Sequence, residues 1–385
     1  MKQGWEIKKL GEVCEIIGGS TPKTGEPSYW DGVHYWITPA ELDGSKYISS
    51  TSRTITDEGV KSAHLQLLPS GTVLLSSRAP IGKVAITTTP MYCNQGFKNL
   101  VCSNMLYNEF AYWFLYYNTE YLNSLGTGAT FKEISKRVVE QIPIPIPSRE
   151  EQERIVAELD CLSGVIERKR EQLRELDALA QSIFYTMFGD PITNEKGWEV
   201  KKLGDIAYIG LGFTHTPEYV EEGVAFLSVK DISGGKICWD NIKYVSQEEY
   251  NAAPKGAKPN RGDIMFCRVG TMGKPVIVDT DIPFCTFVSL GYLHILDKEM
   301  LNIYVKHWMQ SYAFDAQVEQ NVKGVAIKNL NTGWLKTFNI QHPPLNLQKE
   351  FANKIEAIEK QKELIKQSIT QTETLFNARM DYYFN

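Results

Sequence analysis

Two short acid-x-lysine triplets are the closest approach to a catalytic motif in this sequence of 385 residues. They are Glu6-Ile-Lys8 and Glu199-Val-Lys201, and each matches half of a nuclease E-x-K motif. A metal-dependent nuclease also needs a companion acid that helps to hold the ion, and no such acid is placed near either triplet. Because each triplet opens a predicted strand, we expect both to be solvated strand edges.

Other catalytic and metal-binding patterns are absent from the sequence. The six histidines are isolated, and none belongs to an H-E-x-x-H motif or a Cys/His cluster. There is no G-x-S-x-G and no P-loop, and Gly210-Leu-Gly212 lacks the third glycine of a dinucleotide-binding loop. Seven scattered cysteines without a C-x-x-C pair favour reduced, structural thiols. The sequence therefore predicts no catalytic residue, no metal site and no cofactor of its own.

Composition and charge leave the choice of ligand open. Hydrophobic residues make up 43% and charged residues 23% of the chain, which are ordinary globular values. The net charge is −5, but the excess of acid falls mainly in residues 148–190, so the remaining segments are close to neutral. No apolar run approaches the roughly 20 residues that span a bilayer, and the N-terminal residues lack an apolar signal core. We expect a cytoplasmic protein without a membrane partner.

Residues 142–188 contain the strongest structural pattern. Prolines alternate with isoleucines in IPIPIP, which suits an extended segment and forbids a helix. Ser148 then stands three residues before Glu151, as in a capping box. Apolar residues follow at steps of four and three up to Met187, the pattern of a coiled-coil helix. At 1.5 Å per residue this helix would be roughly 58 Å long, and it needs a partner helix to cover its apolar seam.

The C-terminal 43 residues provide that partner. A shift of 196 positions places Pro343 on Pro147 and Gln348 on Gln152, and the steps of four and three recur. The second seam is the more polar of the two, and polar seam residues usually fix pairing and register. The predicted coiled-coil seam consists of Ile155, Leu159, Leu162, Ile166, Leu173, Leu176, Ile183, Phe351, Ile355, Ile358, Ile365, Ile369 and Phe376.

The duplication extends beyond the helices. GWEIKKLG at 4–11 returns as GWEVKKLG at 197–204, and residues 70–86 match residues 261–277. The segments between these landmarks differ greatly, which is expected if a shared frame carries two different ligand-reading surfaces, although drift after an old duplication would also explain it. The predicted fold class is α+β, with two pseudo-two-fold-related globular domains and two long antiparallel helices. The four segments are a first domain at 1–147, a central helix at 148–190, a second domain at 191–342 and a C-terminal helix at 343–385.

This arrangement resembles the specificity subunit of type I restriction–modification systems. The resemblance covers essentially the whole chain. It is carried by the paired openings GWEIKKLGEV and GWEVKKLGDI, by IPIPIPSREEQERIV and QHPPLNLQKEF at the starts of the two helices, and by GTGATFKEIS before the first helix.

The resemblance implies a non-catalytic, DNA-binding subunit. Each globular segment would be a target recognition domain for one half of a split sequence in double-stranded DNA, and the paired helices would set the spacing. Two methyltransferase subunits would dock on the chain, and a restriction and translocase subunit would join for cleavage. S-adenosylmethionine, ATP and Mg²⁺ would be bound by those partners, so this chain would need no cofactor.

Under this interpretation, residues on groove-facing loops are the candidate DNA contacts. Base readout needs side chains with donors and acceptors, and phosphate contacts need basic or amide donors. In the first domain the candidates are Thr21, Lys23, Thr38, Arg78, Lys83, Thr127, Thr130 and Lys132. In the second they are Thr214, His215, Ser228, Lys230, Arg268, Lys274, Lys323 and Lys328, with Arg268 matched to Arg78.

Other interpretations stay open at the level of sequence. Each candidate contact could instead be a solvated charge or a turn residue. The aromatic residues of 109–117 and 302–312 fall at helical spacing and are interpreted mainly as core. For the chain as a whole, the alternative function is a protein-interaction scaffold that does not bind DNA.

Overall fold

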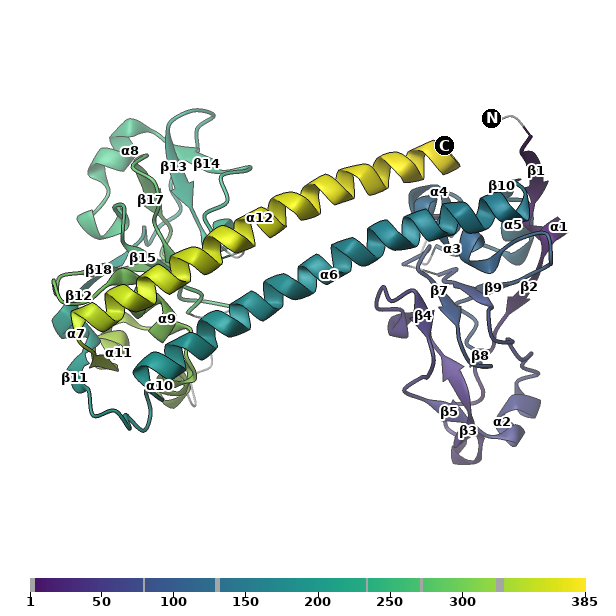
Figure 1. Ribbon diagram of the computed structural model, residues 1–385, viewed down its shortest axis with the longest axis horizontal. Helices are drawn as coiled ribbons and strands as arrows, with labels where there is room; N and C mark the ends of the chain where they lie inside the picture. Colours follow the sequence, from purple (N-terminus) through teal and green to yellow (C-terminus); the bar gives the residue numbers. More distant parts are fainter. Residues whose placement is uncertain (1–3, 79, 129–131, 233–234, 271–272, 323–328) are drawn as a thin grey trace. The chain divides into compact units, whose positions relative to one another are not determined.

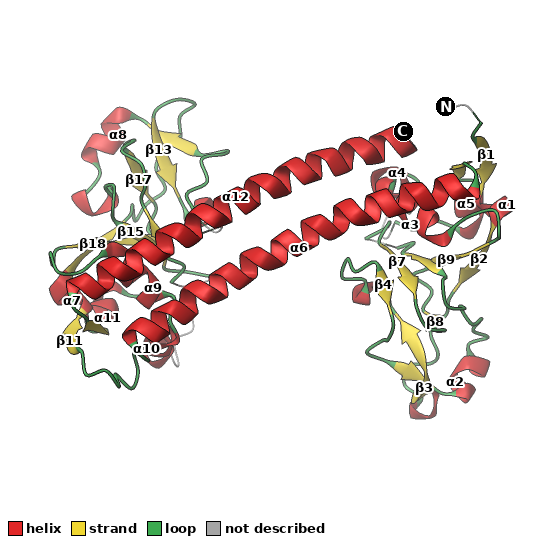
Figure 2. Ribbon diagram, in the orientation of Figure 1, coloured by secondary structure: helices red, strands yellow, loops and turns green. Residues whose placement is uncertain are grey.

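The two repeats fold into two units that share the long helices. The computed structural model describes residues 4–78, 80–128, 132–232, 235–270, 273–322 and 329–385. Unit 1 consists of residues 1–170 and 367–385, and unit 2 of residues 171–366 (Figure 1). Helices and strands are mixed in both units, which confirms the predicted α+β class (Figure 2).

The described residues of unit 1 form three sheets. Their strand orders are β2-β9-β6-β7-β4, β5-β3-β8 and β1-β10. The elements that lie wholly in this unit are β1 (Glu6–Lys9), α1 (Leu10–Val13), β2 (Cys14–Gly18), β3 (Trp30–Ile37), β4 (Tyr47–Ile48), β5 (Thr54–Ile55), α2 (Asp57–Ser62), β6 (Val73–Leu75), β7 (Val84–Thr87), β8 (Tyr92–Cys93), β9 (Lys98–Cys102), α3 (Asn108–Tyr117), α4 (Thr119–Ser124), α5 (Lys136–Glu140) and β10 (Pro143–Ile146).

Unit 2 repeats this plan: its described residues form three sheets, ordered β12-β18-β15-β16, β14-β13-β17 and β11-β19. Its own elements are β11 (Glu199–Lys202), α7 (Leu203–Ile206), β12 (Ala207–Leu211), β13 (Val224–Leu227), β14 (Lys243–Val245), α8 (Gln247–Ala252), β15 (Ile264–Cys267), β16 (Val276–Ile277), β17 (Phe284–Thr286), β18 (Leu290–Ile295), α9 (Asn302–Met309), α10 (Tyr312–Val322), α11 (Thr332–Lys336) and β19 (Asn339–His342). Helices α6 (Arg149–Phe188) and α12 (Leu345–Phe384) each contribute one half to each unit.

The acid-x-lysine triplets lie on the short ladders that close each unit. Strand β1 pairs antiparallel with β10, and β11 pairs in the same way with β19. Lys8 forms an ion pair with Glu6, and the Lys201 ammonium lies 3.0 Å from Asp297. Asp297 also accepts a bond from the Glu299 amide, as the first residue of a turn does. Both lysines are therefore held in ion pairs, Lys201 with an acid outside its triplet, and the described residues contain no group of three or more metal-ligating side chains.

A buried glutamine fastens the start of each long helix to its unit. The Gln152 amide donates to the carbonyls of Met105 and Pro147, each at 3.0 Å, and its oxygen accepts from the Tyr107 amide at 2.7 Å. Gln348 makes the same three bonds to Glu299, Pro343 and Leu301, at 2.8 to 2.9 Å. Both side chains are fully buried. Because buried polar groups are costly when unpaired, these bonds fix where each helix begins.

In unit 1, the first half of α6 packs antiparallel to the second half of α12. Ile155, Leu159 and Ile166 of α6 are buried, whereas Leu162 is half-buried. Two polar contacts stand beside them. The Lys169 ammonium donates to the Ser368 and Thr372 hydroxyls, and Arg379 pairs with Glu158. Lys169, late in this part of α6, contacts residues early in this part of α12, whereas the earlier Glu158 contacts the later Arg379. This order is the one that antiparallel pairing requires. The other predicted seam residues of this unit, Ile369 and Phe376, are also buried.

In unit 2, the second half of α6 packs antiparallel to the first half of α12. Phe351, Ile355 and Ile358 of α12 are buried in the main core of the unit. The Phe351 ring contacts Phe184 of α6 and His307 of α9, so this part of the seam faces both the partner helix and the globular core. The remaining predicted seam residues, Leu173, Leu176, Ile183 and Ile365, are half-buried.

Helices α3 and α9 carry the aromatic residues that close each core. Tyr112 and Trp113 are 3% exposed, and Tyr304 and Trp308 are fully buried. These side chains belong to the core, whereas Tyr116 is 48% exposed. Among the helices described, none is both long and apolar enough to cross a membrane.

Candidate nucleic-acid interface

The loops of unit 1 that carry the predicted DNA contacts meet around residues 94–98. The Asn94 amide donates to the Ile37 carbonyl at 3.0 Å, beside the loop that begins at Thr38. The Ser77 amide donates to Gly96, and the Ile134 amide donates to Ser77 in turn. The loop at residues 19–24 joins the group because the Thr21 hydroxyl donates to Gln95 at 2.5 Å. Segments that are far apart in the sequence thus form one polar surface.

An ionic network crosses this surface. Arg78 donates to Glu133 at 2.9 Å, and the Lys98 ammonium lies 3.2 Å from the other oxygen of Glu133 and 3.3 Å from the Ser77 hydroxyl. Burial opposes ionisation of Glu133, but the hydrogen bonds from Arg78 and Lys98 prevail and hold its pKa below the ordinary value. The Arg78 side chain remains 44% exposed. It is therefore held in place and still accessible to a ligand.

The other candidates in unit 1 fall into two groups. Lys23, Thr127 and Lys132 are exposed and take part in no side-chain bond that the structure gives. Thr38 and Lys83 hold the loops instead: Thr38 caps the short helix Pro39–Glu41 through Glu41, and the Lys83 ammonium donates to the Leu42 carbonyl at 2.8 Å. Thr130 lies outside the described residues.

The equivalent surface of unit 2 forms around residues 286–290. The Phe213 amide donates to Thr286, and the Phe287 amide donates to Leu227. The Arg268 amide donates to the Ser289 carbonyl at 2.9 Å, as the Ser77 amide does to Gly96 in unit 1. The backbone frame of the surface is therefore repeated.

Arg268 departs from the sequence-based expectation. Its backbone bonds match those of Ser77, so the residue that corresponds to Arg78 is Val269, which bridges to Asn329 as Arg78 bridges to Glu133. A shift of one residue in an extended segment turns a side chain to the opposite face. Arg268 is accordingly only 7% exposed, and its guanidinium donates to the carbonyls of Leu330 and Val288 at 3.0 and 2.7 Å. It stabilises two loops and offers nothing to a groove.

Most of the remaining candidates in unit 2 lie at the surface. Thr214, Lys230 and Lys274 are exposed, and the exposed His215 lies 3.1 Å from Glu249. The amide and hydroxyl of Ser228 donate to the Asp231 carboxylate at the start of the short helix Val229–Asp231, as those of Thr38 donate to Glu41 in unit 1. Lys323 and Lys328 lie outside the described residues.

Sequence reasoning missed Gln95, Lys98 and Glu133. All three lie on or beside the segment where the loops meet. A signal was available, because the polar run NQG at 94–96 separates two apolar stretches and therefore marks a turn. The repeat also shows that the charge of Glu133 is specific to unit 1, since Asn329 stands in its place at the equivalent bridge.

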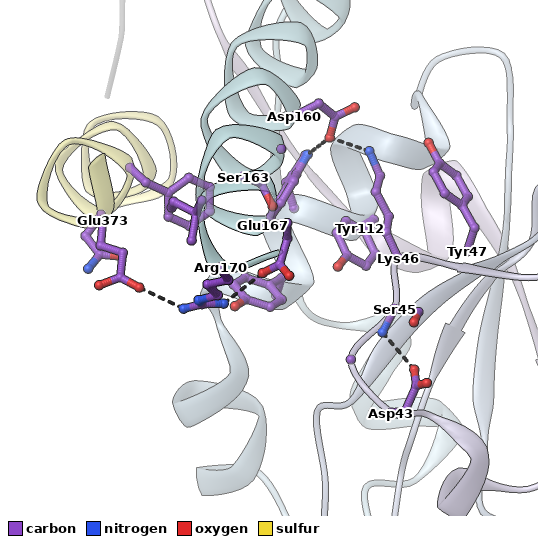
Figure 3. A pocket seen from close by; sticks show the side chains of 17 residues that line it. Asp43, Ser45, Lys46, Tyr47, Tyr112, Asp160, Ser163, Glu167, Arg170 and Glu373 are labelled. Atoms are coloured by element: carbon purple, nitrogen blue, oxygen red, sulfur yellow. Dashed lines mark hydrogen bonds and ion pairs between the residues drawn. The ribbon is translucent and has the colours of Figure 1, made fainter. Parts of the chain in front are cut away.

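A second feature of unit 1 is an open cavity of about 1040 Å³ beside the long helices. It is lined by the loop at residues 43–47, by α3, and by the parts of α6 and α12 that belong to this unit (Figure 3). The Asp160 carboxylate accepts bonds from the Lys46 ammonium at 2.5 Å and the Trp113 indole at 2.9 Å. Arg170 links Glu167 and Glu373 on the opposite wall. Acidic residues outnumber basic ones around the cavity.

Comparison with known proteins gives a consistent picture. Residues 2–178 and 195–374 each match the family described as the type I restriction modification DNA specificity domain. The MjaIX specificity subunit of Methanocaldococcus jannaschii is 32% identical, over 92% of this chain and 86% of its own length. The MjaVIII specificity subunit of the same organism is 22% identical over 93% of this chain and 86% of its own length. A solved chain from a type I restriction–modification complex covers 100% of this chain and 98% of its own length, with a TM-score of 0.62 at 19% identity.

Proposed function

Because this chain belongs to the type I restriction–modification DNA specificity family, we propose that it selects the DNA sequence on which such a complex acts. Its two recognition domains are residues 1–147 and 191–342, and each reads one half of a split target in double-stranded DNA. Residues 148–190 and 343–385 form the spacer. The chain itself catalyses no reaction, and methyl transfer, ATP hydrolysis and cleavage belong to partner subunits.

The observation that carries this proposal is a repeated loop frame with different side chains on it. In both units the same backbone hydrogen bonds bring four loops together. Ser77 occupies one position of this frame in unit 1, and Arg268 occupies the same position in unit 2. The polar groups that this frame presents then differ, with Arg78 and Glu133 in unit 1 and Val269 and Asn329 at the same places in unit 2. Two similar frames with different donors and acceptors suit two half-sites of different sequence.

The partners follow from the same assignment. Two methyltransferase subunits dock on each chain and bring S-adenosylmethionine, and a restriction and translocase subunit brings the ATP and Mg²⁺ site. The ordinary ion pairs and turn bonds of the acid-x-lysine triplets support a chain without chemistry of its own.

The decisive experiment is methylation of a random DNA library by this chain together with its methyltransferase subunit. Sequencing of the methylated molecules is expected to yield one motif with two fixed halves and an unspecified spacer. Methylation without sequence preference would contradict the proposal. DNA affinity of the complex should also fall steeply as salt rises, because phosphate contacts release counterions. A scaffold that does not bind DNA would show no such dependence.

A further inference from the structure

Unit 2 contains a cavity of about 500 Å³ at the place that corresponds to the acidic cavity of unit 1. It is lined by α9 and by the parts of α6 and α12 that belong to unit 2, together with Gly235 and Lys236. Its charge is reversed. Four lysines face two acids, Asp177 and Glu359, and the lysines are Lys236, Lys306, Lys362 and Lys366.

Lys306 is the unusual member of this group. Lys362 is paired with Asp177 and Glu359, and Lys236 is paired with Glu363. Lys306 is half-buried and has neither a hydrogen bond nor an ion pair with any residue in the part of the chain that the structure describes. Burial lowers its pKa; Glu359 opposes that effect and Lys362 reinforces it. A partly desolvated cation without a partner is unfavourable, and an anion would relieve it.

Unit 1 shows which kind of anion fits at this place. Asn108 and Asn302 open α3 and α9 and bond to the equivalent glycines Gly71 and Gly262, so Tyr112 corresponds to Lys306 and Trp113 to His307. In unit 1 the Trp113 indole and the Lys46 ammonium both bind the Asp160 carboxylate. The chain thus supplies its own carboxylate at that place.

Unit 2 lacks this internal carboxylate. When the two long helices are aligned on their equivalent glutamines, Gln152 and Gln348, Asp160 of α6 corresponds to Glu356 of α12. Glu356 is paired with Lys360 at 2.8 Å and does not line the cavity. The Nε2 atom of His307 is buried and lacks a hydrogen-bond partner within the described ranges. Unit 2 therefore presents lysines at this place without the carboxylate that Asp160 supplies in unit 1.

We propose that this cavity of unit 2 receives a carboxylate from an acidic segment of the methyltransferase subunit, in the place that Asp160 fills in unit 1. The inference rests on the proposed function, which supplies the partner. A carboxylate is favoured over a phosphate because unit 1 already holds a carboxylate, that of Asp160, at the equivalent place. The two docking positions on the chain are then chemically different, and only the one on unit 2 depends on Lys306.

The test compares Lys306→Gln and Lys306→Arg with a control, Lys349→Gln, an exposed lysine of α12 that does not line the cavity. Stepwise binding of the methyltransferase subunit to the full chain is measured by sedimentation velocity and native mass spectrometry. Lys306→Gln should weaken one binding step by about tenfold and reduce its salt dependence. Lys306→Arg should retain most of that affinity, and Lys349→Gln should leave both steps unchanged.

A second measurement identifies the occupant directly. Acetylation of Lys306 in the wild-type chain is followed by mass spectrometry, with the methyltransferase subunit alone and with short duplex DNA alone. Protection by the methyltransferase only is expected, and protection by DNA only would overturn the inference. Unchanged binding by Lys306→Gln would also overturn it while leaving the proposed function intact. A wild-type chain that binds no methyltransferase would overturn the proposed function together with the inference.

Discussion

Gln152 and Gln348 show how much one side chain contributes to the frame of each unit. Each is fully buried and satisfies one backbone amide and two carbonyls at the junction between the globular part and a long helix. A residue of similar size without the amide leaves these groups unpaired in a place that water does not reach. The loss therefore exceeds the net value of the hydrogen bonds themselves.

We predict that Gln152→Leu destabilises unit 1 by about 2 kcal/mol, the typical cost of leaving buried backbone groups unsatisfied. Thermal unfolding followed by circular dichroism should show a lower midpoint than in the wild type. Gln172→Leu, an exposed position on the same helix, is the matched control and should leave the midpoint within experimental error. Equal midpoints for both variants would show that the Gln152 bonds contribute nothing.

Glu133 is the residue through which unit 1 limits its own positive charge. It pairs with both Arg78 and Lys98, so two cations on the candidate interface are partly neutralised. We predict that Glu133→Gln strengthens binding to DNA of random sequence and steepens its salt dependence by one to two, roughly one for each cation released. Fluorescence anisotropy at several salt concentrations measures both quantities.

The control for this prediction is Glu140→Gln, which removes an acid from α5 in the same unit, away from the meeting loops. It changes the net charge equally. If both variants changed binding by the same amount, long-range charge rather than the Glu133 contact would be responsible.

At the scale of elements, the periodicity of the sequence predicted the long helices because a seam repeated over many turns is hard to mistake. Ser148 was placed correctly at the start of α6, where its hydroxyl accepts from the Glu151 amide. The polar partners of Lys169 could not be predicted, since Ser368 and Thr372 become neighbours only through antiparallel pairing.

Loops were harder to predict than helices. The pairing of Arg78 with Arg268 followed residue type, whereas the ungapped match of 70–86 with 261–277 and the backbone register both pair Arg268 with Ser77. A departure of one position from that match exchanges an exposed side chain for a buried one. The NQG run marks a turn at residues 94–96, but the meeting of the other loops at that turn depends on hydrogen bonds between distant segments, which no local pattern reveals.

The contact between α6 and α12 in unit 1 carries a pH dependence. Hydrogen bonds from Arg379 lower the pKa of Glu158; burial opposes this effect and the Tyr383 hydroxyl supports it. A carboxyl group whose pKa is lower in the folded state stabilises the fold above its unfolded pKa of about 4.3, and that contribution is lost as the pH falls through the folded value.

We therefore predict that Glu158→Gln lowers the unfolding midpoint at pH 7 and that its difference from the wild type shrinks below about pH 4. The effect at pH 7 should be small, about 1 kcal/mol or less, because the Glu158 side chain is 30% exposed and solvent screens the pair. Thermal unfolding between pH 3 and pH 8 checks this. A difference that is constant over the whole range would assign the effect to packing and not to charge.

At the scale of the whole molecule, α6 and α12 both pass from one unit to the other, and the boundary falls between Arg170 and Glu171 in α6 and between Lys366 and Gln367 in α12. If the helices set the spacer of a split target, their length is the functional quantity. A heptad inserted at both boundaries adds about 10.5 Å, the length of about three base pairs, and returns the seam to nearly the same face.

We predict that this double insertion lengthens the unspecified spacer of the methylated motif and leaves both half-sites unchanged, because every recognition loop keeps its own contacts. Methylation of a random library by the complex, followed by sequencing, measures the spacer and the half-sites in one experiment. Insertion into α6 alone is the control: the helices can then no longer keep the Glu158–Arg379 pair and the Asp177–Lys362 pair in register at the same time, so it should lower stability without defining a new spacer. A changed half-site with an unchanged spacer would show that the helices contribute to base recognition and do not measure distance.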